Sequence, residues 1–134
     1  MKVLLDTHII LWFLANDSRL PDKAKQIILD ERNEILYSTA SVWEIAIKHM
    51  ANPGKIRING SKFADGCRQV GFKMIPIIDS HVAALETLKR PDDAPHHKDP
   101  FDRIMIAQAK AEGLKFVTHD ALLPYYNESC LLSV

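Results

Sequence analysis

Short apolar segments that alternate with stretches of helical spacing are the feature that most constrains how this chain can fold. The predicted strands are KVLLDT, EILYS, KMIPI, LKFVTHD and CLLSV, at residues 2–7, 34–38, 73–77, 114–120 and 130–134. The predicted helices lie at residues 8–17, 20–31, 39–54, 61–70, 79–90 and 101–113. Strands that alternate with helices predict an α/β fold with a mainly parallel central sheet. Pro76 marks the third strand as an edge strand.

Composition limits the classes of protein to which the chain can belong. Its 134 residues are 47% hydrophobic and 25% charged, which is typical of one globular domain over residues 1–134. Lys plus Arg and Asp plus Glu number 17 each, so an overall basic surface for nucleic acid is excluded. Cys67 and Cys130 lie far apart without metal-ligand spacing, which favours reduced thiols in a cytoplasmic protein. Asp6 interrupts the apolar start, so we expect neither a signal peptide nor a membrane span.

Acidic residues follow two of the predicted strands. Asp6 ends the first strand, and Thr118 and Asp120 end the late strand KFVT. In open parallel sheets the functional site lies beyond the carboxyl ends of the strands. Both acids are therefore expected at the same edge of the sheet.

Two further acids lie where a helix begins. Asp99, Pro100 and Asp102 are typical of a helix start, with Asp99 as the N-cap, Pro100 at the first helical position and Asp102 placed as in a capping box. Both carboxylates also favour the positive end of the helix dipole. Helix capping therefore explains each of these acids without any functional site.

The remaining acids have structural alternatives as well. Asp6 can cap the helix that follows it. Glu44 can form an exposed ion pair with Lys48 four residues later, worth only ~0.2–0.5 kcal/mol, although apolar neighbours argue against full exposure. Asp120 can begin a turn or cap the segment ALLPYY.

Convergence of these acids would have a clear chemical consequence. Two carboxylates about 4 Å apart repel by ~4 kcal/mol at an effective dielectric constant of 20. Several of them in one cleft therefore require a cation, and hard oxygen ligands suit Mg²⁺ or Mn²⁺. Such an ion can orient a water, lower its pKa and stabilise the transition state of phosphodiester hydrolysis. The acids concerned are Asp6, Glu44, Asp99, Asp102 and Asp120.

Four stretches in order, LLDTHIILW, STASVWEIAIK, DPFDRIMIAQA and FVTHD, resemble the PIN domain family, specifically VapC-like toxins of prokaryotic toxin–antitoxin pairs. The resemblance covers the whole chain. It implies an α/β/α sandwich on a parallel sheet and a Mg²⁺- or Mn²⁺-dependent ribonuclease. It also implies a homodimer and a cognate antitoxin as protein partner.

The resemblance assigns roles to the acids residue by residue. Asp6, Glu44 and Asp102 would be the core catalytic and metal-binding acids, and Asp120 a more variable fourth. Asp99 belongs to the DPFDR type of sequence, where it would contact the metal through a water or only cap the helix. Cap and ligand need not exclude each other.

Other polar and aromatic side chains have two interpretations each. His96 and His97 can be metal ligands, but solvated loop histidines are the preferred interpretation. Trp12 and Trp43 are expected in the core rather than as base-stacking platforms. Ser38 and Ser41 can cap a helix or bond an acid. Two interpretations remain for four basic residues: they can contact RNA phosphates or form surface ion pairs. The four are Lys48, Arg90, Lys98 and Arg103.

Two other functions compete with the ribonuclease. One is a receiver-like domain whose acids bind Mg²⁺ and accept a phosphoryl group, but FVTHD is not followed by the Lys that this function needs. The other is a PIN-like module with an inactive site that only binds a partner. The complete set of acids argues against it.

Overall fold

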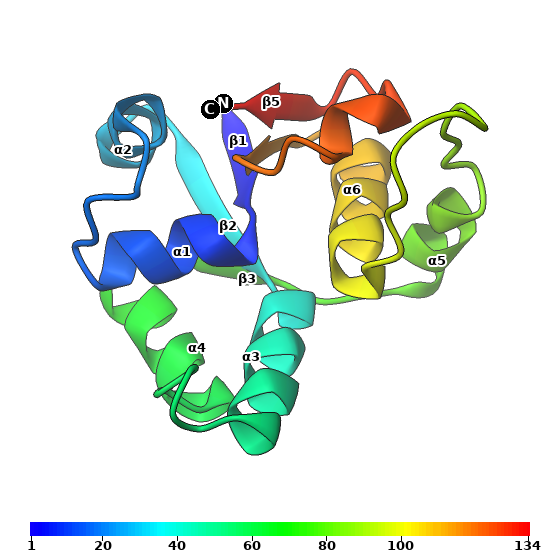
Figure 1. Ribbon diagram of the computed structural model, residues 1–134. Helices are drawn as coiled ribbons and strands as arrows, with labels where there is room; N and C mark the ends of the chain where they lie inside the picture. Colours follow the sequence, from blue (N-terminus) through cyan, green and yellow to red (C-terminus); the bar gives the residue numbers. More distant parts are fainter.

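A five-stranded sheet forms the centre of the computed structural model, which describes residues 1–134 (Figure 1). Its strands are β1 (Lys2–Leu5), β2 (Glu34–Ser38), β3 (Lys73–Ile75), β4 (Lys115–Thr118) and β5 (Leu131–Ser133). The spatial order is β3-β2-β1-β4-β5, and every neighbouring pair is parallel. The predicted α/β fold with a mainly parallel sheet is confirmed, and β3 is an edge strand as Pro76 predicted.

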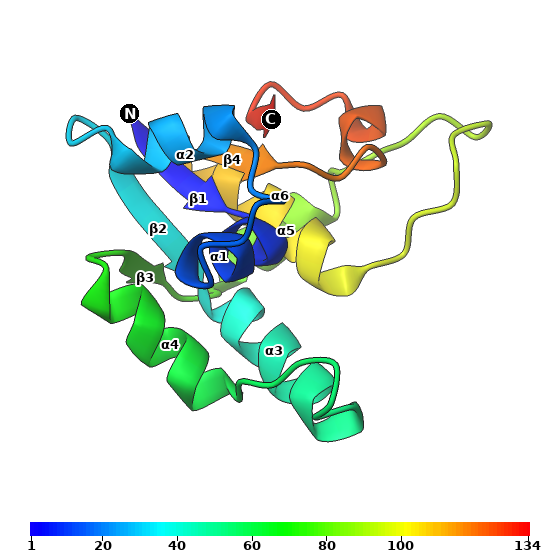
Figure 2. The ribbon, with the colours of Figure 1, turned by 60° about the vertical axis from the view of Figure 1, so that its left-hand side comes forward.

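Helices cover both faces of this sheet, which makes the fold an α/β/α sandwich (Figures 1 and 2). Helices α5 and α6 pack on one face, whereas α1, α2 and α4 pack on the other. Helix α3 continues directly from the end of β2. The helices are α1 (Thr7–Leu14), α2 (Asp22–Leu29), α3 (Thr39–Ala51), α4 (Gly60–Gln69), α5 (Asp79–Leu85) and α6 (Pro100–Glu112), with a 3₁₀ turn η1 (Leu123–Tyr126).

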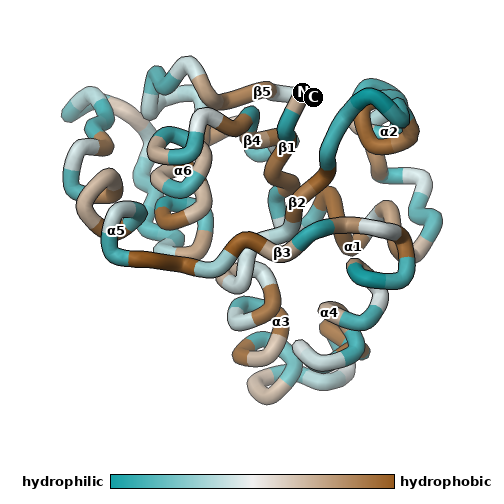
Figure 3. Tube along the Cα trace, turned by 180° about the vertical axis from the view of Figure 1, so that it is seen from behind, coloured by the Kyte–Doolittle hydropathy of each residue, from teal (hydrophilic) through white to brown (hydrophobic).

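Alternation along β1 divides the hydrophobic core between the two faces. Val3 and Leu5 belong to the cluster beneath α1, α2 and α4, whereas Leu4 belongs to the cluster beneath α5 and α6. All three side chains are fully buried. Burial of a Val or Leu side chain stabilises the fold by about 1.5–3 kcal/mol. Figure 3 shows hydrophobic residues along the strands at the centre of the fold.

Helix ends follow the sequence signals in part. Gly113, with a φ of 68°, closes α6 at the end of the predicted range 101–113, because a left-handed residue suits the position after a helix. Helix α5 begins without a side-chain cap, because its N-cap residue is Ile78. The backbone N–H of Ile78 instead donates to Nδ1 of His81, in the first turn of the helix, at 3.2 Å.

The chain order reverses at β1, and this reversal places the site. Strands β2 and β3 extend the sheet on one side of β1, while β4 and β5 extend it on the other. A crevice forms where the connections diverge, outside the carboxyl ends of the strands. The crevice of this sheet therefore lies between the ends of β1 and β4. None of the helices has the length and apolar composition needed to cross a membrane.

Candidate active site

Asp6 lies at the carboxyl end of β1 and is 6% exposed. Its Oδ2 accepts a hydrogen bond from the Thr118 hydroxyl at the end of β4, with 2.7 Å between the oxygens. Although Asp6 occupies the N-cap position of α1, its side chain makes no capping bond. The capping interpretation of Asp6 is therefore wrong, and its carboxylate faces the crevice instead.

Glu44, in the second turn of α3, is only 2% exposed. Its Oε1 accepts a hydrogen bond of 2.7 Å from the Thr7 hydroxyl. Its Oε2 pairs with Nζ of Lys48. The predicted ion pair is therefore present, but the carboxylate is buried rather than exposed.

The N-terminus of α6 carries Asp99 and Asp102 in different roles. Oδ1 of Asp99 accepts hydrogen bonds from the backbone N–H groups of Phe101 and Asp102, at 2.9 and 3.2 Å, so the predicted N-cap is confirmed. Asp102 makes no reciprocal bond to the backbone of Asp99, and the capping-box prediction is wrong. Oδ2 of Asp102 instead lies 3.2 Å from Nε2 of His97. The cap fixes the start of α6. It therefore also fixes the backbone position from which the Asp102 side chain extends.

Asp120 follows β4 in a turn. Its Oδ1 accepts a hydrogen bond of 2.8 Å from the backbone N–H of Leu122, as the turn interpretation expects. Its own N–H donates to the hydroxyl of Thr118. Thr118 therefore links Asp6 and Asp120 through one side chain.

All five predicted acids line one cleft of about 280 Å³. No Lys or Arg lines it. Its other walls are aromatic, imidazole or aliphatic, namely Trp12, His8, His119 and Ile9. Five carboxylates without a lining cation make the cleft strongly anionic when the acids are ionised.

The pKa values of the two most buried aspartates reflect this crowding. Burial raises the pKa of Asp102 to about 9, and the negative charge of Asp6 is the next largest cause. Burial also raises the pKa of Asp6 to about 6, against the opposing hydrogen bond from Thr118. Without a cation, the protein therefore holds protons that a bound cation would displace.

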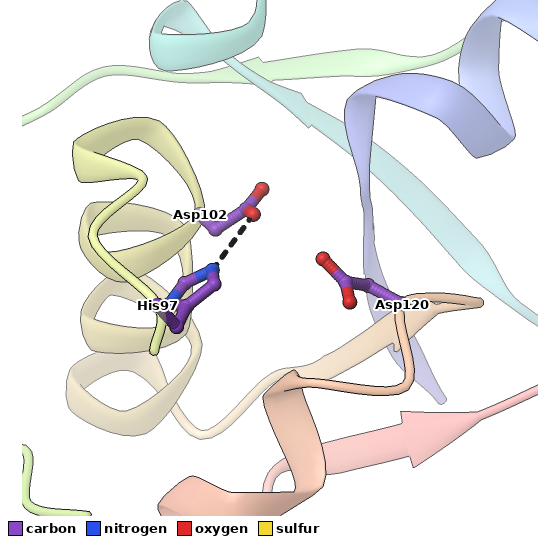
Figure 4. Close-up of side chains that lie close together, drawn as sticks. All are labelled: His97, Asp102 and Asp120. Atoms are coloured by element: carbon purple, nitrogen blue, oxygen red, sulfur yellow. Dashed lines mark hydrogen bonds and ion pairs between the residues drawn. The ribbon is translucent and has the colours of Figure 1, made fainter. Parts of the chain in front are cut away.

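The donor set fits a small divalent cation. One ligand atom each from His97, Asp102 and Asp120 lies within 4.8 Å of the others (Figure 4). In Figure 4 the Asp120 carboxylate points toward Asp102 and His97. Asp6 and Glu44 supply further carboxylate oxygens in the same cleft. An oxygen-rich set of this kind suits Mg²⁺ or Mn²⁺.

Sequence reasoning missed two partners of these acids. His97 was expected as a solvated loop histidine, but its side chain is 4% exposed and bonds Asp102. The role of Thr7 was not foreseen, although a hydroxyl directly after a strand-ending acid is a usable signal. Neither serine bonds an acid directly: Ser38 caps α3, and Ser41 bonds the hydroxyl of Thr7 at 2.8 Å.

The aromatic and basic side chains also differ from expectation. Trp43 is 56% exposed, so the core interpretation is wrong for it. Trp12 is partly buried against the core beneath α1 and also lines the cleft. Lys98 and Arg103 form no ion pair, and Arg90 lies over the ring of Tyr126 instead. RNA contact by these basic residues stays a prediction.

An acid-lined cleft at the switch point of a parallel sheet defines a class of α/β domain suited to binding divalent metals. The chain belongs to the PIN domain family, which it matches over residues 3–127. Membership supports nuclease activity, and PIN nucleases generally use divalent metals. Receiver domains have the strand order 2-1-3-4-5, so the order 3-2-1-4-5 and the family match both contradict the receiver-like alternative.

Solved structures share this fold at low sequence identity. The structure of VapBC2 from Rickettsia felis, bound to a DNA fragment from their promoter, gives a TM-score of 0.67 at 16% identity, covering 100% of this chain and 98% of that one. A toxin–antitoxin complex from Klebsiella pneumoniae gives 0.59 at 17% identity, covering 98% and 96%. FitAcB from Neisseria gonorrhoeae gives 0.61 at 16% identity, covering 98% and 96%. No curated protein matches the sequence of this chain.

Proposed function

We propose that the protein is a metal-dependent endoribonuclease that hydrolyses RNA phosphodiester bonds, and that it is the toxin of a VapBC-type toxin–antitoxin pair. One observation carries the proposal. Acids from four separate segments of the chain meet at one sheet edge, in a cleft that no Lys or Arg lines. Family membership supports the nuclease, and the fold shared with toxin–antitoxin complexes supports the pairing.

We assign catalysis to Asp6, Glu44, Asp102 and Asp120, and metal binding to these four together with Asp99. A bound Mg²⁺ or Mn²⁺ would supply Lewis-acid polarisation of the phosphoryl group and a more acidic water. Asp6 and Asp102 are buried, with 6% and 8% of their surface exposed, so little solvent reaches their carboxylates. Asp120 is more exposed and stands nearer to solvent, where substrate arrives.

A neighbouring groove offers a path for the substrate. It has a volume of about 400 Å³ and shares His8 and Glu44 with the acidic cleft. Lys48 and Lys55 line it, and lysines of this kind contact phosphate groups. Trp12 lines the cleft, and Arg19 lies over its ring at 5.7 Å from the centroid. An unpaired base would stack on the part of the ring that borders the cleft.

An apolar stripe on α3 supports a protein partner. Trp43, Ile47 and Met50 are 56%, 40% and 75% exposed, and their spacing places them on one side of the helix. An exposed apolar stripe is typical of an interface. We propose that the protein forms a homodimer and binds a cognate antitoxin. An Arg presented by that antitoxin would suit the anionic cleft.

We further propose that residues 1–134 act as one nuclease domain in the cytoplasm. The family match over residues 3–127 supports the domain extent. Cys67 and Cys130 are both free and buried, which suits a reducing compartment.

RNA cleavage by the purified protein tests the proposed activity. A labelled structured RNA is incubated with Mg²⁺ or Mn²⁺, and EDTA is expected to stop cleavage. Asp6→Asn is expected to abolish cleavage while its circular dichroism spectrum stays unchanged. The control is Asp92→Asn, which neutralises an exposed acid outside the cleft. Cleavage at the wild-type rate by Asp6→Asn would contradict the assignment. A folded protein without any cleavage would favour the inactive binding module.

Expression in a bacterial host tests the toxin assignment. Growth arrest is expected on induction of the wild type, and co-expression of the adjacent small protein is expected to relieve it. Expression of Asp6→Asn is the control, because growth arrest by this variant too would reflect the burden of expression and not the proposed activity. Light scattering at micromolar concentration tests the dimer, and a monomeric mass would contradict it.

A further inference from the structure

His97 connects the acidic cleft to a second part of the chain. The residue lies in the irregular segment before α6, and its Nε2 is 3.2 Å from Oδ2 of Asp102. At the other side of the ring, Nδ1 lies 2.7 Å from the hydroxyl of Tyr126 in η1. Both ring nitrogens are therefore engaged, although only one nitrogen of a neutral imidazole carries a proton.

The charge of Asp102 decides where that proton lies. An ionised carboxylate can only accept hydrogen bonds, so Nε2 must donate to Oδ2 when Asp102 is ionised. Nδ1 must then accept, and the hydroxyl of Tyr126 must donate to it. The hydroxyl of Tyr126 thus fixes the tautomer of His97 that can serve Asp102.

His97 is also held firmly in place. Its side chain is 4% exposed, and its ring stands nearly perpendicular to the ring of Tyr126, with centroids 5.5 Å apart. The guanidinium group of Arg90 lies over the ring of Tyr126, 5.3 Å from its centroid. Arg90 also donates to the carbonyl of Pro95, which ties down the segment that carries His97. A histidine fixed in this way can hold a carboxylate in one orientation.

Asp102 needs such a partner. Oδ2 is bonded by His97, whereas Oδ1 makes no hydrogen bond within the protein. A free Asp102 side chain could rotate and exchange its two oxygens. The bond to Oδ2 removes that freedom and leaves Oδ1 as the oxygen available to a cation in the cleft.

We propose that His97, with its tautomer fixed by Tyr126, is a positioning residue that orients the Asp102 carboxylate toward the divalent cation. The inference rests on the proposed function, because it assumes that Asp102 binds a metal ion. Removal of a residue that hydrogen-bonds a metal-binding side chain typically lowers metal affinity by about 10- to 100-fold.

Mn²⁺ and Mg²⁺ binding to the intact protein, measured by isothermal titration calorimetry without RNA, tests the inference. His97→Leu is expected to weaken the binding of both ions by about 10- to 100-fold. His97→Gln keeps a donor near the position of Nε2 and is expected to recover most of the affinity. Tyr126→Phe, which releases the tautomer, is expected to fall between wild type and His97→Leu. The matched control is His96→Leu, because His96 is exposed and bonds no acid.

The outcomes separate this inference from the proposed function. Absence of Mg²⁺ and Mn²⁺ binding by the wild type would refute the metal site itself. Wild-type affinity in a folded His97→Leu, together with loss of binding in Asp102→Asn, would refute only the role of His97. A loss confined to Mn²⁺ would make His97 a direct nitrogen ligand and would overturn the positioning role, since Mg²⁺ takes oxygen ligands whereas Mn²⁺ also binds at mixed nitrogen and oxygen sites. If His97→Leu does not fold, His97→Gln and Tyr126→Phe decide, and equal wild-type affinity in both would overturn the proposal.

Discussion

The hydroxyl of Thr118 donates to Oδ2 of Asp6 across 2.7 Å, joining residues that are 112 positions apart in the sequence. The bond connects the carboxyl ends of β1 and β4, the two strands between which the chain order reverses. It also lowers the pKa of Asp6, against the larger effect of burial. One hydroxyl thus helps to keep a buried acid ionised at the switch point of the sheet.

Removal of this hydroxyl is expected to destabilise the protein. Thr118→Val keeps the shape of the side chain but leaves Asp6 without its donor, which costs about 1–3 kcal/mol of unfolding free energy. Thr118→Ser, which keeps the hydroxyl, is the matched control and is expected to remain closer to wild type. Urea unfolding in EDTA measures the difference. Equal unfolding midpoints for the Val and Ser variants would show that the bond contributes nothing.

Neutralisation of Asp102 is expected to stabilise the metal-free protein. The pKa of Asp102 is raised from 3.8 to about 9 in the folded state. The group's contribution to stability is therefore complete below pH 3.8 and is lost as the pH rises toward 9. Asp102→Asn does not titrate, so its advantage over wild type should grow across this range. At neutral pH we expect about 1 kcal/mol, or about 2–6 °C in melting temperature.

The control for Asp102→Asn is an acid that only starts a helix. Asp22 lies in the first turn of α2 and lines no part of the cleft. Asp22→Asn is expected to lose about 0.3–1 kcal/mol through the helix dipole. Thermal unfolding in EDTA from pH 5 to pH 9 distinguishes the two acids. A less stable Asp102→Asn with no pH trend would leave Asp102 as a helix-start acid alone.

Lys48 is expected to act as the cation of Glu44 when no metal is bound. Lys48→Met keeps the apolar stem but leaves the buried Glu44 with only the Thr7 hydroxyl, at a cost of about 1–3 kcal/mol. With Mn²⁺ present the deficit should shrink, because the ion stabilises the native state and offsets the charge of Glu44. Lys55→Met, at a lysine without an ion pair in the same groove, is the control. An identical deficit for Lys48→Met with and without Mn²⁺ would separate Glu44 from the metal site.

Trp12 is expected to contribute to RNA binding. It lies between His8 and His119, with ring centroids 5.9 and 6.0 Å away, and it lines the cleft. Stacking of one base on an aromatic ring is worth about 1–3 kcal/mol, so Trp12→Ala should weaken binding of single-stranded RNA by about 5- to 150-fold. Fluorescence anisotropy in an Asp6→Asn background avoids cleavage. Trp43→Ala, outside the cleft, is the control, and equal losses in both variants would refute a specific role for Trp12.

The sequence predicted most of the architecture because its signals were local. Apolar runs such as KVLL and EILYS predicted strands within two residues of their observed ends. The strand-ending positions of Asp6 and Asp120 predicted a shared edge, since parallel strands end on the same side. Asp99 was correctly predicted as a cap, because its hydrogen bonds reach only the next three residues.

The partners of the acids could not be predicted in the same way. Asp102 was expected to complete a capping box, but a tertiary contact with His97 replaced the local bond. Trp43 was expected in the core, yet α3 turns it outward against Phe101. Helical spacing shows which residues share a face, but only packing decides which face is covered.

By itself, the sequence determined the parallel α/β fold and the set of acids at one sheet edge. These predictions rest on periodicity, on carboxylates at strand ends, and on Pro and Gly. Each of these signals depends only on residues that are close together in the sequence, so it does not require knowledge of the tertiary contacts. Only the tertiary structure decided that Thr118 serves Asp6, that Thr7 and Lys48 share Glu44, and that His97 holds Asp102. The reason is physical: a buried carboxylate must find hydrogen-bond partners, and which groups lie within reach depends on how distant segments pack together.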